Sequence, residues 1–156
     1  MLGFFKKKNQ QTASENQYAG VAFGPFVINV PQDWACVNDN GTLRAHKNDV
    51  VRLSISIRDM SNSADYTPDE LFATVKAGYF DSDINWGAYS AVIKKGDIIY
   101  QTLEYIDEPR LAIAVVGKVV ANKNLALIAS FAGNSGKDLE AYFDTFISIL
   151  ETIEVM

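Results

Sequence analysis

The chain has 156 residues, of which 48% are hydrophobic and 21% charged, a composition that predicts one globular domain with a substantial core. Its formal net charge of −5 argues against a nucleic-acid partner, because phosphate binding needs a clustered basic surface. The first 17 residues hold three of the 14 basic residues and one of the 19 acidic residues, so the rest of the chain is more acidic still. This charge favours a basic protein partner, or it serves solubility.

The single cysteine, Cys36, excludes an internal disulfide and a cysteine-based zinc site, and it predicts a cytoplasmic location. No stretch reaches the roughly 18 apolar residues of a membrane span. Residues 1–17 are polar and predict a flexible N-terminal arm, followed by a single α+β domain over residues 18–156. The arm begins with two phenylalanines and three lysines, which leaves open a contact with an anionic membrane surface.

The first half of the domain is expected to form strands. Alternating Phe26, Ile28 and Val30 predict a strand that Pro31 ends, since proline has no N–H to donate. Residues 38–41, Asn-Asp-Asn-Gly, predict a tight turn between strands at 34–37 and 42–46. The clearest alternation follows, with four apolar and four polar residues on opposite faces of one strand: Val51, Leu53, Ile55 and Ile57 against Arg52, Ser54, Ser56 and Arg58.

A helix is predicted over residues 68–80. Thr67 supplies a capping hydroxyl, Pro68 occupies the first helical position, and Glu70 completes a capping box. The apolar face of this helix is expected to consist of Leu71, Phe72, Val75 and Tyr79.

The second half predicts four strands and a terminal helix. The strands are expected at residues 88–93, 98–105, 111–121 and 125–132. Both faces are apolar or small in residues 111–116 and 125–131, which predicts central strands covered on both sides. Ser135 marks the start of the terminal helix, and its apolar face recurs at helical spacing in Leu139, Phe143, Phe146, Leu150 and Ile153. The fold class is therefore α+β, with an antiparallel sheet flanked by helices on both faces.

This order of elements resembles the PsbP-like superfamily, which includes photosystem II extrinsic proteins, a Ran-binding nuclear import factor and many uncharacterised bacterial proteins. The resemblance covers residues 20–155. It rests on residues 26–31 with Trp34, on the strand at 53–57 followed by 67–71, and on the terminal helix with Phe143, Phe146 and Ile147. It implies a three-layer sandwich, usually without catalysis, in a small protein of bacterial type. It implies no binding residues, because members bind different partners.

Cys36 and His46 are the sole thiol and the sole imidazole of the chain. The predicted turn could bring their strands side by side, as a nucleophile and its base would require. A slip of one residue would instead put the two side chains on opposite faces. No nucleophile signature surrounds Cys36, so we expect a small buried hydrophobic residue there and no catalytic residues.

Metal and phosphate motifs are also missing. The carboxylates at 81–83 and 107–108 lack the spacing of a calcium loop. Residues 133–136 lack the phosphate-loop pattern and predict a turn with a helix cap. We therefore expect no metal and no cofactor.

Five aromatic residues cluster around the predicted helix and the loop after it: Tyr66, Tyr79, Phe80, Trp86 and Tyr89. Aromatic side chains often line recognition surfaces, although core packing explains about half of them equally well. Trp86 lies in a polar loop and is the predicted anchor for a partner.

The favoured function is a non-catalytic protein-binding domain, as an adaptor or an immunity-type protein, whose partner is another protein, with a basic one favoured. The alternatives are a small-ligand carrier with a cleft between sheet and helix, and an enzyme.

Overall fold

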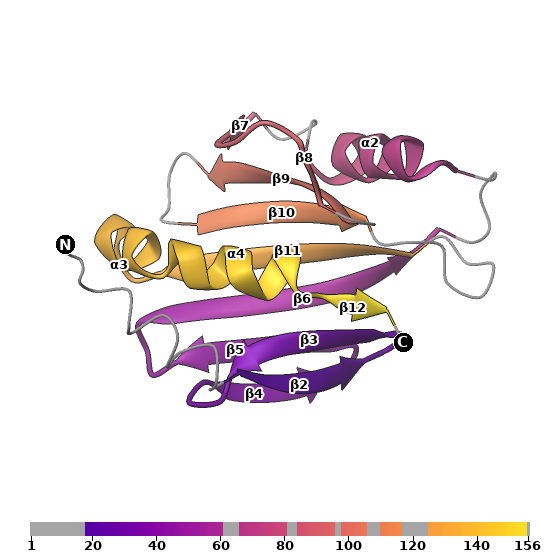
Figure 1. The fold of residues 1–156 in the computed structure, drawn as a ribbon. Helices are drawn as coiled ribbons and strands as arrows, with labels where there is room; N and C mark the ends of the chain where they lie inside the picture. Colours follow the sequence, from indigo (N-terminus) through magenta and orange to yellow (C-terminus); the bar gives the residue numbers. More distant parts are fainter. Residues whose placement is uncertain are drawn as a thin grey trace.

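The computed structural model describes residues 18–60, 66–80, 84–95, 98–105, 110–116 and 125–155, with 110–116 described by their backbone. The predicted arm at 1–17, the carboxylates at 81–83 and 107–108, and the end of the strand predicted at 111–121 lie outside these residues. Two antiparallel sheets dominate the described structure (Figure 1). No helix among the described residues combines the length and apolarity needed to cross a membrane.

The main sheet has the strand order β4-β5-β6-β11-β10-β9-β7, and β8 also pairs with β9. After β6 the chain builds the helix and strands of the far half, and then returns to insert β11 between β6 and β10. The strands of this sheet are β4 (Ala35–Asp39), β5 (Thr42–Lys47), β6 (Val51–Asp59), β7 (Trp86–Ala88), β8 (Ile93–Lys95), β9 (Ile98–Tyr105), β10 (Arg110–Val116) and β11 (Leu125–Gly133).

A smaller sheet joins the two ends of the described chain. Its order is β12-β3-β2, formed by β2 (Tyr18–Phe23), β3 (Phe26–Pro31) and β12 (Glu154–Val155). In Figure 1 this sheet lies in front of β4 and β5. The side chains of Phe26, Ile28 and Val30 are buried, as the alternation predicted.

The predicted tight turn is confirmed between β4 and β5. Asp39 pairs with Thr42, which leaves Asn40 and Gly41 as a two-residue loop with φ values of 50° and 83°. Positive φ at both positions is the geometry of a type I′ turn, for which Asn-Gly is the preferred pair.

The C-terminal helices pack on one face of the main sheet. They are α3 (Gly136–Ala141) and α4 (Phe143–Glu151), and α4 runs in front of β11 and β6 (Figure 1). Phe146 stacks on Phe131 with ring centroids 4.1 Å apart. The sequence predicted one continuous helix here, whereas the structure has a break at Tyr142, where φ is −105° and ψ is 7°.

The opposite face of the sheet carries α2 (Pro68–Tyr79). The capping box is confirmed, because the Thr67 hydroxyl accepts from the Glu70 N–H at 3.2 Å and the Glu70 carboxylate accepts from the Thr67 N–H at 2.9 Å. Three buried side chains of α2 pack against Ile99, Leu103 and Ala126 of the sheet: Leu71, Phe72 and Val75.

The prediction of an antiparallel α+β fold is confirmed, but the helical cover is unequal. The face beneath α4 is covered by two helices and the small sheet, whereas α2 packs on β9, β10 and β11. The strand predicted at 88–93 is wrong, since β7 ends at Ala88 and β8 begins at Ile93. Between these two strands Ser90 contacts β9 through its side chain, because the Ser90 hydroxyl accepts a hydrogen bond from the Thr102 N–H at 3.1 Å.

A hydrogen-bonded cluster ties the end of α4 to the main sheet. The Tyr100 hydroxyl donates to the Glu151 carboxylate at 2.6 Å, and the Lys95 ammonium donates to the same group at 3.1 Å. The hydrogen bond from Tyr100 lowers the pKa of Glu151. Partial burial acts in the opposite direction, and the contact with Lys95 lowers the pKa further. Burial, followed by the bond to Glu151, raises the pKa of Tyr100, so its hydroxyl stays a donor.

Replacing Tyr100→Phe should lower the free energy of unfolding at pH 7 by about 1.5–3 kcal/mol, the usual contribution of a hydrogen bond to a charged group. Because folding lowers the pKa of Glu151, the ionised carboxylate stabilises the fold above its unfolded pKa of about 4.3. That stabilisation is lost as the pH falls through the lower native value. Urea unfolding at neutral pH and near pH 3 should therefore show the difference between wild type and variant shrinking in acid. A difference that does not change with pH would contradict this account.

Candidate functional site

The open part of the main sheet is the face of β4, β5 and β6 that lies on the same side as α2. Strand alternation places Arg44 and His46 of β5 on this face, beside Arg52 and Ser54 of β6. The same register places Leu43 and Leu53 on the opposite face, where they are buried in the main core. The polar face predicted for residues 51–58 is thus the exposed face of the sheet.

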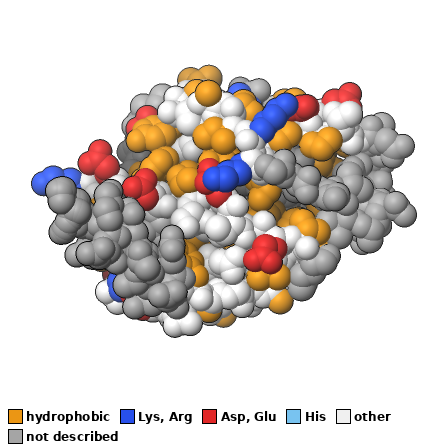
Figure 2. Space-filling model, viewed as in Figure 1, with side chains coloured by type: hydrophobic (Ala, Val, Ile, Leu, Met, Phe, Trp, Pro, Cys, Tyr) orange, Lys and Arg blue, Asp and Glu red, His pale blue; other side chains and the backbone are white. Residues whose placement is uncertain are grey.

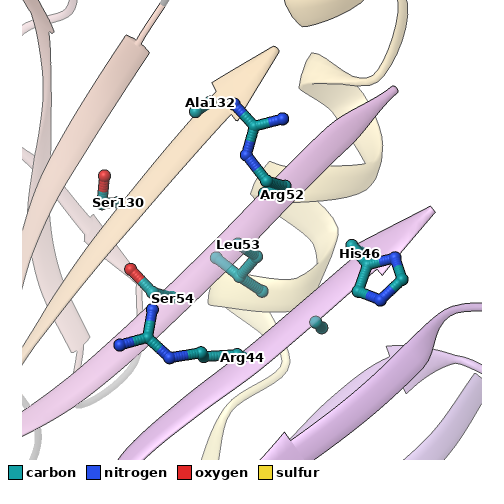
Figure 3. A pocket seen from close by; sticks show the side chains of 8 residues that line it. Arg44, His46, Arg52, Leu53, Ser54, Ser130 and Ala132 are labelled. Carbon is teal, nitrogen blue, oxygen red and sulfur yellow. The ribbon is translucent and has the colours of Figure 1, made fainter. Parts of the chain in front are cut away.

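A hollow of about 420 Å³ lies on this face, where β5, β6 and β11 run side by side (Figure 3). Ser54 pairs with Ser130 across β6 and β11, and Ala132 pairs with Arg52. Because these side chains are short, the middle of the face is recessed, and the longer side chains of Arg44 and Arg52 surround it. The lining residues are Arg44, Ala45, His46, Arg52, Leu53, Ser54, Ser130 and Ala132.

Neighbouring groups hold the polar side chains around the hollow in place. The Arg52 guanidinium donates to the Asn134 side-chain oxygen at 3.2 Å. Asn134 is itself anchored, because its backbone N–H donates to the Val50 carbonyl at 3.1 Å and its side-chain amide donates to the Asp49 carbonyl. The loop after β11 therefore positions Arg52.

Arg44 and His46 also contact neighbouring polar groups. Arg44 lies 3.6 Å from the Asp39 carboxylate, and both side chains are more than half exposed. Nδ1 of His46 lies 2.6 Å from the Asn48 carbonyl oxygen. A carbonyl can only accept, so Nδ1 carries the proton and Nε2 is the ring atom left for a ligand.

The electrostatics of this face differ from those of the whole chain. On the described strands β4, β5, β6 and β11 it carries Arg44, His46, Arg52 and Arg58, and Asp39 is the only carboxylate. Figure 2, seen from the α4 side, shows hydrophobic side chains interspersed with both signs of charge. Arginine forks bind carboxylates and phosphates through paired N–H donors. The open face is therefore locally cationic on a chain whose net charge is −5.

The hypothesis of a thiol and imidazole dyad is contradicted by the register. Cys36 pairs with Ala45, and His46 pairs with Ala35, so the two side chains lie on opposite faces of the sheet. The expectation that Cys36 is buried is also wrong, because β4 is an edge strand and Cys36 is exposed. Partial burial of its thiol still raises the pKa of Cys36.

The five predicted aromatic residues do not form one surface. Trp86 packs edge-on against Phe80 at 5.6 Å and Tyr105 at 4.8 Å, and Tyr66 joins the same cluster beneath α2. Tyr79 is 46% exposed, and the Arg58 guanidinium lies 4.9 Å from its ring.

Tyr89 lies apart from the other four. It is 51% exposed, and its ring centroid lies 5.5 Å from that of Phe143 of α4, on the other side of the sheet. A role in partner binding for these five residues stays a prediction.

The helix cap predicted at 133–136 is confirmed, because the Ser135 hydroxyl accepts from the Asp138 N–H at 3.2 Å. Within the described ranges, no group of three or more histidine, cysteine, aspartate or glutamate side chains is placed to hold a metal ion.

Sequence reasoning missed the hollow itself. Alternation already separated Arg52 and Ser54 from the apolar face of their strand. No local pattern indicated that Ser130 would lie beside Ser54, because the two are 76 positions apart in the chain and only the insertion of β11 beside β6 joins them.

Solved structures supply the informative comparison, since no family model and no curated protein sequence matches the chain. The Ran-binding protein Mog1p of Saccharomyces cerevisiae aligns with a TM-score of 0.57 at 6% identity, over 88% of this chain and 95% of that one. LpqN of Mycobacterium tuberculosis, involved in cell envelope biogenesis, aligns with a TM-score of 0.57 at 13% identity, over 94% and 96%. These similarities are consistent with the PsbP-like resemblance in its α+β fold, and they show the fold alone.

Replacing Trp86→Ala should destabilise the protein by about 2–4 kcal/mol, because the ring fills space between Phe80 and Tyr105. The nearby Ile84 is 89% exposed, so Ile84→Ala should change the free energy of unfolding by less than about 0.5 kcal/mol. Urea unfolding of both variants measures the difference. A Trp86→Ala variant as stable as wild type would restore the residue as a candidate surface anchor.

Cys36 should react slowly with iodoacetamide near pH 8, because the raised pKa keeps its reactive thiolate scarce. His46→Ala should leave this rate within about twofold, since the imidazole lies on the other face. The thiol of urea-unfolded protein is the reference for an unshielded cysteine. A large loss of reactivity in His46→Ala would show that the two groups communicate.

Proposed function

We propose that this chain is a non-catalytic protein-binding domain of the adaptor type, which contacts its partner through the open face of β4, β5, β6 and β11. The hollow carries this proposal. The short side chains of Ser54, Ser130 and Ala132 lie at its centre, and the longer side chains of Arg44 and Arg52 lie around them. A sheet face with a recess surrounded by polar groups suits recognition of another surface.

The fold similarity supports the proposal without carrying it. Mog1p is a Ran-binding protein, so a domain of this shape can bind another protein. The separation of Cys36 from His46 removes the one catalytic pair that the sequence suggested. A cytoplasmic location is part of the proposal and rests on the single cysteine.

The open face also bears on the alternatives. The carrier hypothesis places its ligand between sheet and helix, where Leu71, Phe72 and Val75 are buried against the sheet. A basic partner, favoured by the net charge, remains a proposal for the acidic remainder of the surface. The arginine side chains around the hollow favour a partner that presents acidic groups there.

Ser54→Trp should block the proposed contact, because a large ring placed in the centre of the hollow fills the recess. The matched control is Ala141→Trp, at an exposed position of α3 on the covered side of the sheet. Tagged wild type and both variants are used to capture proteins from an extract of the source cell, with quantitative mass spectrometry as the measurement. Proteins that bind wild type and Ala141→Trp should be lost with Ser54→Trp.

Thermal melts of the three proteins show whether each variant is folded. The proposal fails if folded Ser54→Trp captures the same proteins as wild type, because the open face would then not be the contact surface.

A further inference from the structure

We infer that the hollow binds an extended acidic segment of the partner protein, whose carboxylates pair with Arg44 and Arg52. This inference rests on the proposed function and adds the chemistry of the partner. Its basis is the sign of the charge on the open face and the spacing of the two arginines.

The spacing follows from the strand register. Arg44 is paired with Ser54 across β5 and β6, and Arg52 lies two residues before Ser54 on the same face. Such diagonal positions on neighbouring strands are about 7–8 Å apart. An extended segment projects every second side chain to the same side, at a repeat of about 6.6–6.8 Å. The backbone positions of the two arginines therefore match alternate residues of an extended segment, while their guanidinium groups point apart, Arg44 toward Asp39 and Arg52 toward Asn134.

The centre of the hollow suits a polypeptide backbone. Ser54 and Ser130 lie side by side across β6 and β11, so their short side chains allow close approach and their hydroxyls can donate or accept. His46 adds Nε2 at the rim, because Nδ1 is engaged by the Asn48 carbonyl. A segment lying over this centre meets cationic groups on its two sides and small polar groups beneath it.

The existing contacts of the arginines allow this exchange. The pair between Arg44 and Asp39 is exposed, with N–O separation of 3.6 Å, and exposed pairs contribute little to stability. An incoming carboxylate can therefore replace Asp39 at little cost. Arg52 keeps its bond to Asn134 at 3.2 Å, which leaves further guanidinium N–H groups for the segment.

A polypeptide fits this surface better than a nucleic acid. The chain has a net charge of −5, which repels a polyanion at long range. The hollow is lined by arginine, histidine, serine, alanine and leucine residues and offers no Phe, Tyr or Trp ring for stacking bases. A short segment with two or three carboxylates meets the cationic strip without extending over the acidic remainder.

A polypeptide also fits better than a small free anion. The Arg44 side chain is 57% exposed, so an isolated anion beside it would remain hydrated and weakly held. A segment can engage both arginines at once, which makes the second contact intramolecular and strengthens binding.

The test uses a short fluorescent peptide with glutamate at every second residue and serine between, titrated with the full-length protein and followed by fluorescence anisotropy. Binding should weaken as salt is raised. Arg44→Glu should weaken it by about tenfold or more, since it replaces attraction by repulsion at the contact. The control Lys137→Glu, an exposed position of α3 on the covered side of the sheet, should change it by less than about twofold.

Arg52→Gln provides a second variant that removes the positive charge and adds no negative charge, and it should also weaken binding. Melting curves establish that each variant is folded. The inference is overturned if Arg44→Glu and Lys137→Glu weaken binding equally, or if either a peptide with lysine in place of glutamate or an oligothymidine strand binds more tightly. Inorganic phosphate that displaces the peptide at equal concentration would also overturn it, as a site for small anions.

The two proposals fail in different ways. If the glutamate peptide does not bind but Ser54→Trp still loses captured proteins, the open face binds a protein, and the inference that the bound segment is acidic is wrong. If the peptide binds as expected but Ser54→Trp loses no captured protein, the proposed function fails and the anion chemistry of the hollow stands.

Discussion

The pairing of β11 with β6 is the contact on which the rest of the structure depends. It joins the first half of the chain to the second along the full length of both strands, from Val51 with Gly133 to Asp59 with Leu125. Its register sets both faces at once, because a shift by one residue would exchange them. In the observed register Phe131 and Leu53 share the covered face, while Ser130 and Ser54 share the open one. The core and the hollow are therefore two results of one alignment.

The unequal cover of the sheet explains why a surface remains available. The face beneath α4 is buried by two helices and the small sheet, and the rings of Phe131 and Phe146 stack at its centre. On the other face α2 is 12 residues long, which at about 1.5 Å per residue gives a helix of about 18 Å. It packs on β9, β10 and β11. On this face the strands beyond it carry mostly polar side chains, with Val37 as an exposed apolar exception, so their exposure costs little.

Net charge and local charge lead to different expectations for the partner. The formal charge of −5 favours a basic partner at long range, but contact is decided by the groups that meet. On the open face Arg44, His46 and Arg52 gather on neighbouring strands, because alternate residues of β5 and β6 point the same way. A partner with an acidic segment on an otherwise basic surface would satisfy both the long-range field and the contact.

The sequence by itself determined most of the local structure, since each feature depends on residues close together in the chain. The capping box at Thr67, the Asn-Gly turn and the alternation of β6 are of this kind. It also predicted an α+β fold with an antiparallel sheet. Only the tertiary structure decided that Cys36 and His46 face apart, that Trp86 packs against Phe80, and that Ser130 lies beside Ser54. These depend on strand register and on which element covers which face, and both are set by contacts between distant residues that no local pattern records.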